Sequence, residues 1–322
     1  MTTSRPFAPP LVVLAGGVLA VSTASIFIRY AQEYAPSLVI AAWRLTLATV
    51  ILTPFALTRR RDELGSLTRR ELGLALLAGF FLALHFATWI SSLAFTTVAS
   101  SVVLVDTAPL WVALIAPLAL GERISRPVKI GMWLAFVGGV LVALSDACVW
   151  TSSGLVCPPV GEFVRGKAFL GDLLALAGAL TAAMYLIIGR RVRSRVSLVT
   201  YIFVVYGVSA VALIFFMLAA GQPALGYPPV AYLWFLMLAI FPQLLGHTSY
   251  NWALGYLPAA YVSIALLGEP VGSTLLAVVF LGEIPSLSKI IGGMVILAGI
   301  YIASRQSQDP SPSTYRGNHA DR

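Results

Sequence analysis

Long apolar segments alternate with short polar ones along almost the whole chain. A helix that crosses a bilayer core of roughly 30 Å needs about 20 predominantly apolar residues. Ten segments approach that length, and we expect each to form a transmembrane helix. They are Leu11–Ile28, Pro36–Leu57, Gly73–Ala94, Val98–Ala119, Pro127–Leu144, Ala168–Gly189, Val199–Ala220, Val230–Trp252, Ala259–Leu281 and Leu287–Ser304.

The Lys and Arg residues lie mostly on one side of these segments. If the N-terminus is cytoplasmic, 16 of the 21 Lys and Arg residues fall in cytoplasmic segments and four fall on the opposite side. Arg44, the remaining one, lies inside a segment. Because cytoplasmic loops carry an excess of Lys and Arg, we expect a multi-pass protein of the plasma or inner membrane with both termini cytoplasmic.

Composition indicates lipid as the main solvent. Of the 322 residues, 59% are apolar and 11% are charged, less than half of the roughly 25% charged residues of soluble domains. The net charge of +8 sits at the ends of apolar segments, which favours contact with membrane lipid and not with nucleic acid. We find no nucleotide-binding loop and no catalytic or metal-binding motif, so we expect neither an enzyme nor a cofactor.

The two halves of the chain resemble each other. A shift of 161 residues lays 96–142 over 257–303, and each half holds five segments. Because five is odd, the second half must be inverted in the membrane relative to the first, an architecture typical of secondary transporters. The most specific identical pairs are Pro109/Pro270, Gly121/Gly282, Glu122/Glu283, Ser125/Ser286, Gly131/Gly292 and Gly138/Gly299.

These repeated motifs resemble the EamA-type family of the drug/metabolite transporter superfamily. Each half has a proline in its fourth helix, then Gly-Glu, a short turn and a glycine-bearing fifth helix, and Arg44 lies in the second helix. The resemblance implies an all-α integral membrane protein of ten helices in two inverted five-helix repeats. It also implies transport of a small-molecule substrate, often export of amino acids or related solutes. We expect repeats at 11–145 and 168–304, an extracytoplasmic loop at 146–167 and a disordered tail at 305–322.

Two other functions are consistent with an apolar helical bundle. An intramembrane enzyme that acts on a lipid would need acids and bases clustered near one face, and the chain offers no such cluster. A facilitative channel would differ from a transporter in showing no saturation or counterflow. The inverted repeat favours alternating access by a secondary transporter.

Five ionisable residues lie inside the apolar segments, away from the segment ends: Arg44, His85, Asp106, His247 and Glu269. Such residues usually face a cavity, because each costs roughly 2.5–3.5 kcal/mol at a helix centre. Arg44 and Asp106 both lie about 12 Å deep, so they could form an ion pair that either holds two helices or acts as a gate. Each histidine could bond a neighbouring helix or relay protons. Glu269 lies near the midplane, as a substrate ligand or a proton-coupling group.

Pro109 and Pro270 break backbone hydrogen bonds near Asp106 and Glu269, so each either marks a cavity or merely bends its helix. Glycines spaced seven apart, Gly131/Gly138 and Gly292/Gly299, predict close packing within the monomer or in a homodimer. Aromatic residues could line a substrate cavity or act as packing residues and interface anchors. They are Trp43, Trp89, Trp111, Tyr250, Trp252 and Tyr261.

The two cysteines, Cys148 and Cys157, both lie in the long loop placed outside the cell. Disulfides persist in that compartment, and the intervening residues are rich in Gly, Ser and Pro. We expect a disulfide, the alternative being two free thiols.

Overall fold

The computed structural model describes residues 8–119, 126–151, 154–193, 195–253 and 268–305. Within these residues, eight helical segments are long and apolar enough to cross a membrane, and two further apolar helices, Gly268–Leu281 and Leu287–Ile302, are shorter. The chain is therefore a multi-pass membrane protein. The segment expected at 259–281 is described only from residue 268.

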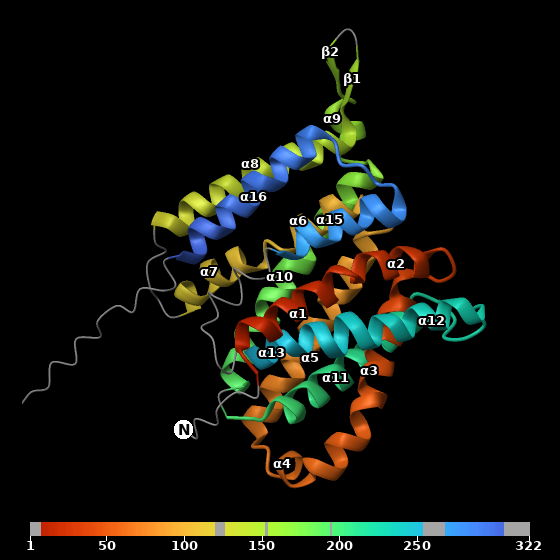
Figure 1. Ribbon diagram of the computed structural model, residues 1–322, viewed down its shortest axis with the longest axis vertical. Coiled ribbons are helices and arrows are strands. Elements are labelled where there is room, and N and C mark those ends of the chain that lie inside the picture. The colour runs from red at the N-terminus through yellow and green to blue at the C-terminus, as the bar shows by residue number, and fades with distance from the viewer. Residues whose placement is uncertain (1–7, 120–125, 152–153, 194, 254–267, 306–322) are drawn as a thin grey trace, which may run out of the picture.

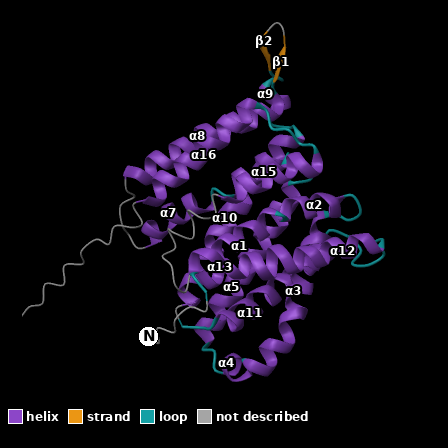
Figure 2. Ribbon diagram, viewed as in Figure 1, coloured by secondary structure: helices purple, strands orange, loops and turns teal. Residues whose placement is uncertain are grey.

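The described residues are helical apart from one small hairpin (Figure 2). Several spans consist of two or three consecutive helices. The elements are α1 (Pro10–Ser22), α2 (Ala24–Gln32), α3 (Ser37–Arg59), α4 (Arg61–Gly65), α5 (Arg69–Ser92), α6 (Val98–Val105), α7 (Ala108–Ala119), α8 (Arg126–Ala147), β1 (Val149–Thr151), β2 (Gly154–Val156), α9 (Val160–Phe163), α10 (Lys167–Arg193), α11 (Leu198–Ala219), α12 (Pro229–Leu238), the π-helix η1 (Ala239–His247), α13 (Thr248–Ala253), α15 (Gly268–Leu281) and α16 (Leu287–Arg305).

Helices from the two halves of the chain pack against each other. Helix α3 packs on α11, α5 on α10, α1 on η1 and α13, α6 on α15, and α8 on α16 (Figure 1). Glycines permit the close approach of α8 and α16: a Cβ at Gly138 would lie 2.6 Å from the carbonyl oxygen of Gly292, and one at Gly299 would lie 2.6 Å from that of Gly131. The predicted glycine faces are therefore used within the monomer.

The buried core is divided unequally. One large apolar cluster joins residues of α2, α3, α5, α6, α10, α11, α12, η1 and α15, whereas a small one joins residues of α6, α7, α8, α10 and α16. Only 22% of the α8 span is buried, and Trp133 and Phe136 on α8 are exposed by 66% and 62%. The α8–α16 pair therefore forms an outer layer with little burial against the rest of the bundle.

One end of the bundle, here called the Glu283 end, is held by a polar cluster. Arg29, near the end of α2, pairs with Glu283 at 2.5 Å and donates to the carbonyl of Leu93. The second carboxylate oxygen of Glu283 accepts the N–H of Val98 at the start of α6. One glutamate thus connects elements from both halves of the chain.

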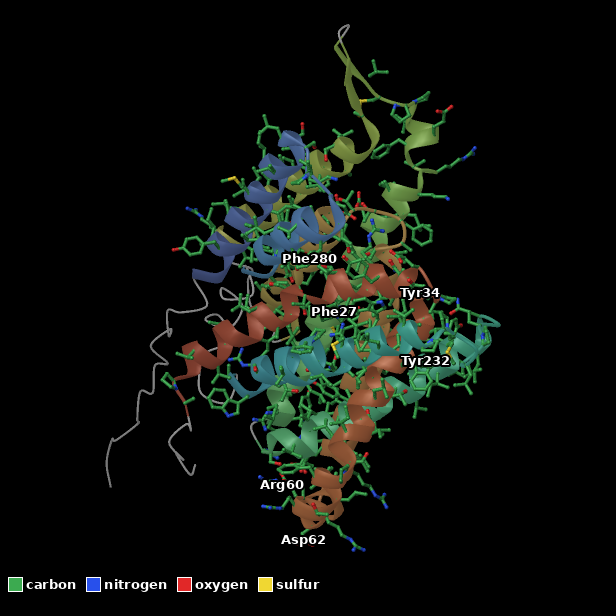
Figure 3. All side chains as sticks on the ribbon, turned by 45° about the vertical axis from the view of Figure 1, so that its right-hand side comes forward. Phe27, Tyr34, Arg60, Asp62, Tyr232 and Phe280 are labelled. Carbon is green, nitrogen blue, oxygen red and sulfur yellow. A yellow bond between two sulfur atoms is a disulfide. The ribbon has the colours of Figure 1, made fainter. Side chains whose placement is uncertain are left out.

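The opposite end, here called the Glu63 end, has its own cluster around the short helix α4. Glu63 accepts hydrogen bonds from the backbone N–H and the hydroxyl of Ser197 and from the hydroxyl of Thr200. These bonds cap the N-terminus of α11, because Ser197 is its N-cap residue. Arg60 and Asp62 extend from this end, far from Phe280 (Figure 3).

The segment between α8 and α10 forms the antiparallel hairpin β1–β2 and the short helix α9. It extends beyond the helical bundle (Figure 1). A disulfide joins Cys148 and Cys157 across the base of the hairpin. The length of this segment, which no repeat motif accounts for, thus corresponds to a small closed unit.

Candidate functional site

A buried polar cavity lies where α5, α6, α7, α10, η1, α13 and α15 meet. Its volume is about 70 Å³, roughly that of two water molecules in the liquid. Its polar lining residues include six that the sequence predicts, together with Tyr185: His85, Trp89, Asp106, His247, Tyr250, Glu269 and Tyr185.

Local breaks in helix geometry position these residues. Helix α6 ends at Val105, and α7 begins at Ala108, directly before Pro109. Asp106 lies in this break as the C-cap residue of α6. Glu269 and Pro270 are buried in the first turn of α15. His247 ends the π-helix, which contains Pro242. Proline cannot donate to the carbonyl four residues earlier, and π turns are frequent at functional sites.

One carboxylate oxygen at the site lacks a hydrogen-bond partner in the described part of the chain. Asp106 Oδ2 is buried and has no partner among the described residues. Glu269 is 6% exposed and lies within electrostatic range of Asp106. Trp89 Nε1 and Tyr250 Oη are also buried without a partner in the described chain. Because buried polar groups are normally hydrogen-bonded, these atoms point to a polar ligand.

Arg44 does not pair with Asp106 as the sequence predicts. Its Nε donates to Gln243 Oε1 at 2.9 Å, and its guanidinium carbon lies 4.2 Å from the ring centroid of Phe86. Its two Nη atoms have no hydrogen-bond partner in the described residues. Arg44 is within electrostatic range of Glu269, so it lies behind the cavity wall as a compensating charge.

Both histidines pack into the wall of the cavity. His85 Nδ1 donates to the carbonyl of Gly178 on α10 at 3.0 Å, which is the interhelical bond that was one of its two expected roles. Its ring stacks on Trp89, with centroids 5.8 Å apart. The His247 ring lies edge-on to Phe86, with centroids 5.4 Å apart. The two imidazole centroids are 6.4 Å apart.

Four predicted aromatic residues are not placed at this cavity. Trp252 packs against the small cluster that contains Leu14 and Tyr250. Trp43 lies near the N-terminus of α3, where its Nε1 donates to the carbonyl of Ala224 and its ring stacks on Phe235. Trp111 lines a different, apolar pocket. Tyr261 lies outside the described residues.

Three polar residues that organise the site were not predicted from the sequence. They are Gln243, which binds Arg44, and the pair Tyr185 and Asn251, whose side chains are joined at 2.9 Å. The predicted polar residues were ionisable groups inside apolar segments and included no amide. An amide inside an apolar segment also indicates a buried polar site, because its polar atoms need hydrogen-bond partners there.

An apolar helical bundle that encloses buried, unpartnered charged groups defines a multi-pass membrane protein of the solute-transporter class. The profile of the EamA-like transporter family matches residues 9–144 and 169–305. The chain belongs to this family, as its repeated motifs predict, and is therefore a membrane transporter of the drug/metabolite type.

Several relatives support this placement along nearly the whole length. An uncharacterized transporter of Archaeoglobus fulgidus is 25% identical over 88% of this chain and 92% of its own length. The uncharacterized transporter YyaM of Bacillus subtilis is 23% identical, covering 85% of this chain and 86% of that protein. A crystal structure with 20% sequence identity has a similar fold, with a TM-score of 0.61 over 93% of this chain and 99% of that one.

Proposed function

We propose that this protein is a secondary transporter that moves a small metabolite carrying an ammonium group, such as an amino acid or related amine, by alternating access. The observation that carries the proposal is the cavity shared by Asp106 and Glu269. Glu269 lies within electrostatic range of both Asp106 and Arg44, so Arg44 is the nearby compensating cation. If all three are ionised, the local charge is one negative unit, which a single ammonium group would balance. Uncompensated buried charge is strongly unfavourable.

The same charge balance supports coupling to protons. A proton bound by either carboxylate would neutralise the site as well as the ammonium group does. Protons and substrate therefore compete for Asp106 and Glu269, and a proton gradient would drive the amine in the opposite direction. We propose export as the physiological direction, in keeping with the resemblance to drug/metabolite transporters.

We further propose ten helices in two inverted repeats. Reciprocal contacts support this arrangement: Gly131 meets Gly299 while Gly138 meets Gly292, and the shift of 161 residues turns the first contact into the second. Phe86 and His247, which the same shift relates, are in ring contact. Contacts of this kind arise at a two-fold axis. With the N-terminus cytoplasmic, the Glu63 end faces the cytoplasm and the Glu283 end faces outward.

A binding panel on the purified protein tests the substrate class. Each amine is compared with its hydroxy analogue, which is close to it in size and carries no positive charge, and with its N-acetyl derivative, which is uncharged and larger. We expect at least tenfold tighter binding of the amines. Asp106→Asn and Glu269→Gln should each remove this preference, whereas Glu33→Gln, at an exposed position, should keep it. Equal binding of amine and N-acetyl compounds by the wild type would refute the proposal.

A further inference from the structure

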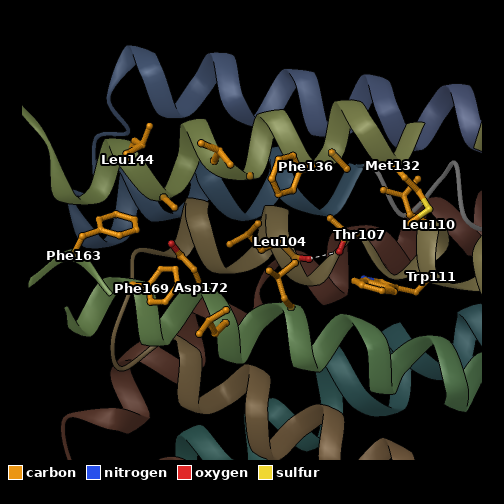
Figure 4. Close-up of a pocket in the computed structure, with 16 residues that line it drawn as sticks. Leu104, Thr107, Leu110, Trp111, Met132, Phe136, Leu144, Phe163, Phe169 and Asp172 are labelled. Atoms are coloured by element: carbon orange, nitrogen blue, oxygen red, sulfur yellow. Dashed lines mark hydrogen bonds between the residues drawn. The ribbon is translucent and has the colours of Figure 1, made fainter. Parts of the chain in front are cut away.

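A second, larger pocket lies beside the polar cavity, between α8 and the helices α6, α7, α9 and α10 (Figure 4). Its volume is about 470 Å³. Its lining is mostly apolar, with side chains such as Leu104, Leu110, Phe136, Leu144, Phe163 and Phe169. It also includes the buried carboxylate of Asp172, which accepts a hydrogen bond from the hydroxyl of Thr96 at 3.1 Å. Thr107 also lines it, and its hydroxyl donates to the carbonyl of Leu104 at 2.7 Å.

The two cavities share one wall, the break between α6 and α7. Leu104, Thr107 and Leu110 face the apolar pocket, whereas Val105, Asp106 and Ala108 face the polar cavity. Helix α10 continues along both, with Leu173 and Leu176 in the apolar pocket and Ala182 and Tyr185 in the polar cavity. The wall is thus a single chain segment at the point where its helix is interrupted.

The small polar cavity suits the charged end of an amphipathic molecule, and the larger apolar pocket suits its hydrocarbon part. The polar cavity, at about 70 Å³, is much smaller than the apolar pocket, at about 470 Å³. The carboxylates of Asp106 and Glu269 and the apolar pocket lie on opposite sides of the α6–α7 break, so the pocket is an adjacent larger space for the body of a substrate. Phe136 and Val140 line this pocket and are exposed by 62% and 42%, so it also borders the surface that faces lipid.

We propose that the apolar pocket binds the hydrocarbon tail of the substrate while its ammonium group binds Asp106 and Glu269. This inference rests on the proposed function, which it narrows to amines with an apolar tail. The substrate then reaches the site along α8, from the lipid-facing side, with its charged end entering through the α6–α7 break. For one molecule to occupy both cavities the α6–α7 break must open, and Thr107 and Asp106 then lie beside the junction of its tail and its ammonium group.

Gly139 on α8 offers a direct way to fill the pocket. It lines the pocket, and a Cβ built there would lie 3.7 Å from Leu104 Cδ2, an ordinary contact. Gly139→Leu therefore places a side chain in the space proposed for the tail, and Gly139→Ala fills less of it. Val137→Leu is the matched control, because Val137 is exposed on the same helix and is not among the residues that line the pocket.

The experiment measures binding of methylamine, butylamine and hexylamine to each purified protein in nanodiscs, with empty nanodiscs as the partitioning blank. We expect the ratio of the Gly139→Leu to the wild-type dissociation constant to rise with tail length, to roughly tenfold for hexylamine. Exclusion of about two methylenes at about fourfold each accounts for this size. Gly139→Ala should give a smaller rise in the ratio, and Val137→Leu should give none.

The outcomes separate this inference from the proposed function. If no amine binds the wild type, the proposed function fails. If amines bind in a Glu269-dependent way but the ratio does not depend on tail length, the tail pocket is wrong. A phospholipid that native mass spectrometry finds bound to the wild type, that is lost in Gly139→Leu and that hexylamine does not displace would assign the pocket to a lipid chain and overturn the proposal.

Discussion

Arg44 is a fully buried cation that an amide and an aromatic ring hold in place. Its position in an apolar segment is evident from the sequence, but its partners are not, because depth along a helix does not specify the direction in which a side chain points. The sequence predicted Asp106 at the same depth, whereas the guanidinium lies against Gln243 and Phe86. Asp106 instead shares a cavity with Glu269.

The Gln243 amide should therefore contribute measurably to stability. Gln243→Leu removes the hydrogen-bond acceptor of Arg44 Nε and leaves a buried charge without it, which we expect to cost about 1.5–3 kcal/mol. Gln243→Glu keeps an acceptor at the same place and should retain or raise stability. Thermal unfolding of the three purified proteins measures the difference. A melting temperature for the leucine variant equal to that of the wild type would contradict this role of Gln243.

At the scale of elements, sequence patterns located the spans well and their interruptions only in part. Pro109 predicted a break near Asp106, and the helix is interrupted at that point. The π-helix around Pro242 was not predicted, although it carries Gln243 and His247. A proline in an apolar run indicates a disturbed helix, but the form of the disturbance depends on the packing of neighbouring helices.

The cluster at the Glu283 end predicts a closed gate on that side. Arg29, Glu283 and the N–H of Val98 join α2, α6 and the end of α15, so access to the cavity from this side requires these contacts to separate. Glu283→Gln should increase, roughly fivefold, the rate at which Ala182→Cys reacts with a membrane-impermeant thiol reagent from outside. The background carries Cys148→Ser and Cys157→Ser, and Glu162→Gln is the control. An unchanged rate would show that the cluster does not limit access.

The cluster at the Glu63 end predicts a defined pH dependence. Partial burial raises the pKa of Glu63, but hydrogen bonds from Ser197 and Thr200 outweigh it, so the pKa lies below the usual 4.5. A carboxylate with a depressed pKa stabilises the fold above its unfolded-state pKa, and this contribution is lost as the pH falls below about 4.5. The difference in melting temperature between wild type and Glu63→Gln should be largest at neutral pH and shrink below pH 4.5. A difference independent of pH would contradict this account.

At the scale of the whole molecule, the repeat is detectable in the sequence because a few Pro, Gly and Glu residues recur in one register. The site is not repeated. Under the shift of 161 residues Glu269 corresponds to Ala108 and Asp106 to Leu267, so the halves supply different groups to one cavity. The hairpin β1–β2 falls outside both repeats, and its form could not be predicted from them.

Fusions of a reporter enzyme that is active only in the cytoplasm test the orientation of the whole chain. We expect activity after Arg305 and none within 154–165, because the Lys and Arg bias places the first inside and the second outside. The disulfide between Cys148 and Cys157 belongs to the same prediction, since it requires an oxidising compartment. Full alkylation of both thiols in native membranes, or an active reporter in the hairpin segment, would reverse the orientation.

The most direct measurement for the central claim is the flux of an amine through Glu269→Gln in proteoliposomes, driven by a pH gradient and, separately, by exchange at equal pH. We propose that Asp106 and Glu269 together hold the ammonium group. In Glu269→Gln only the negative charge of Asp106 remains, and it balances the positive charge of Arg44 when no substrate is bound. The account therefore predicts that both fluxes fall at least tenfold. Unimpaired exchange with loss of only the gradient-driven flux would restrict Glu269 to proton coupling, and unchanged flux in both assays would contradict the assignment of the site.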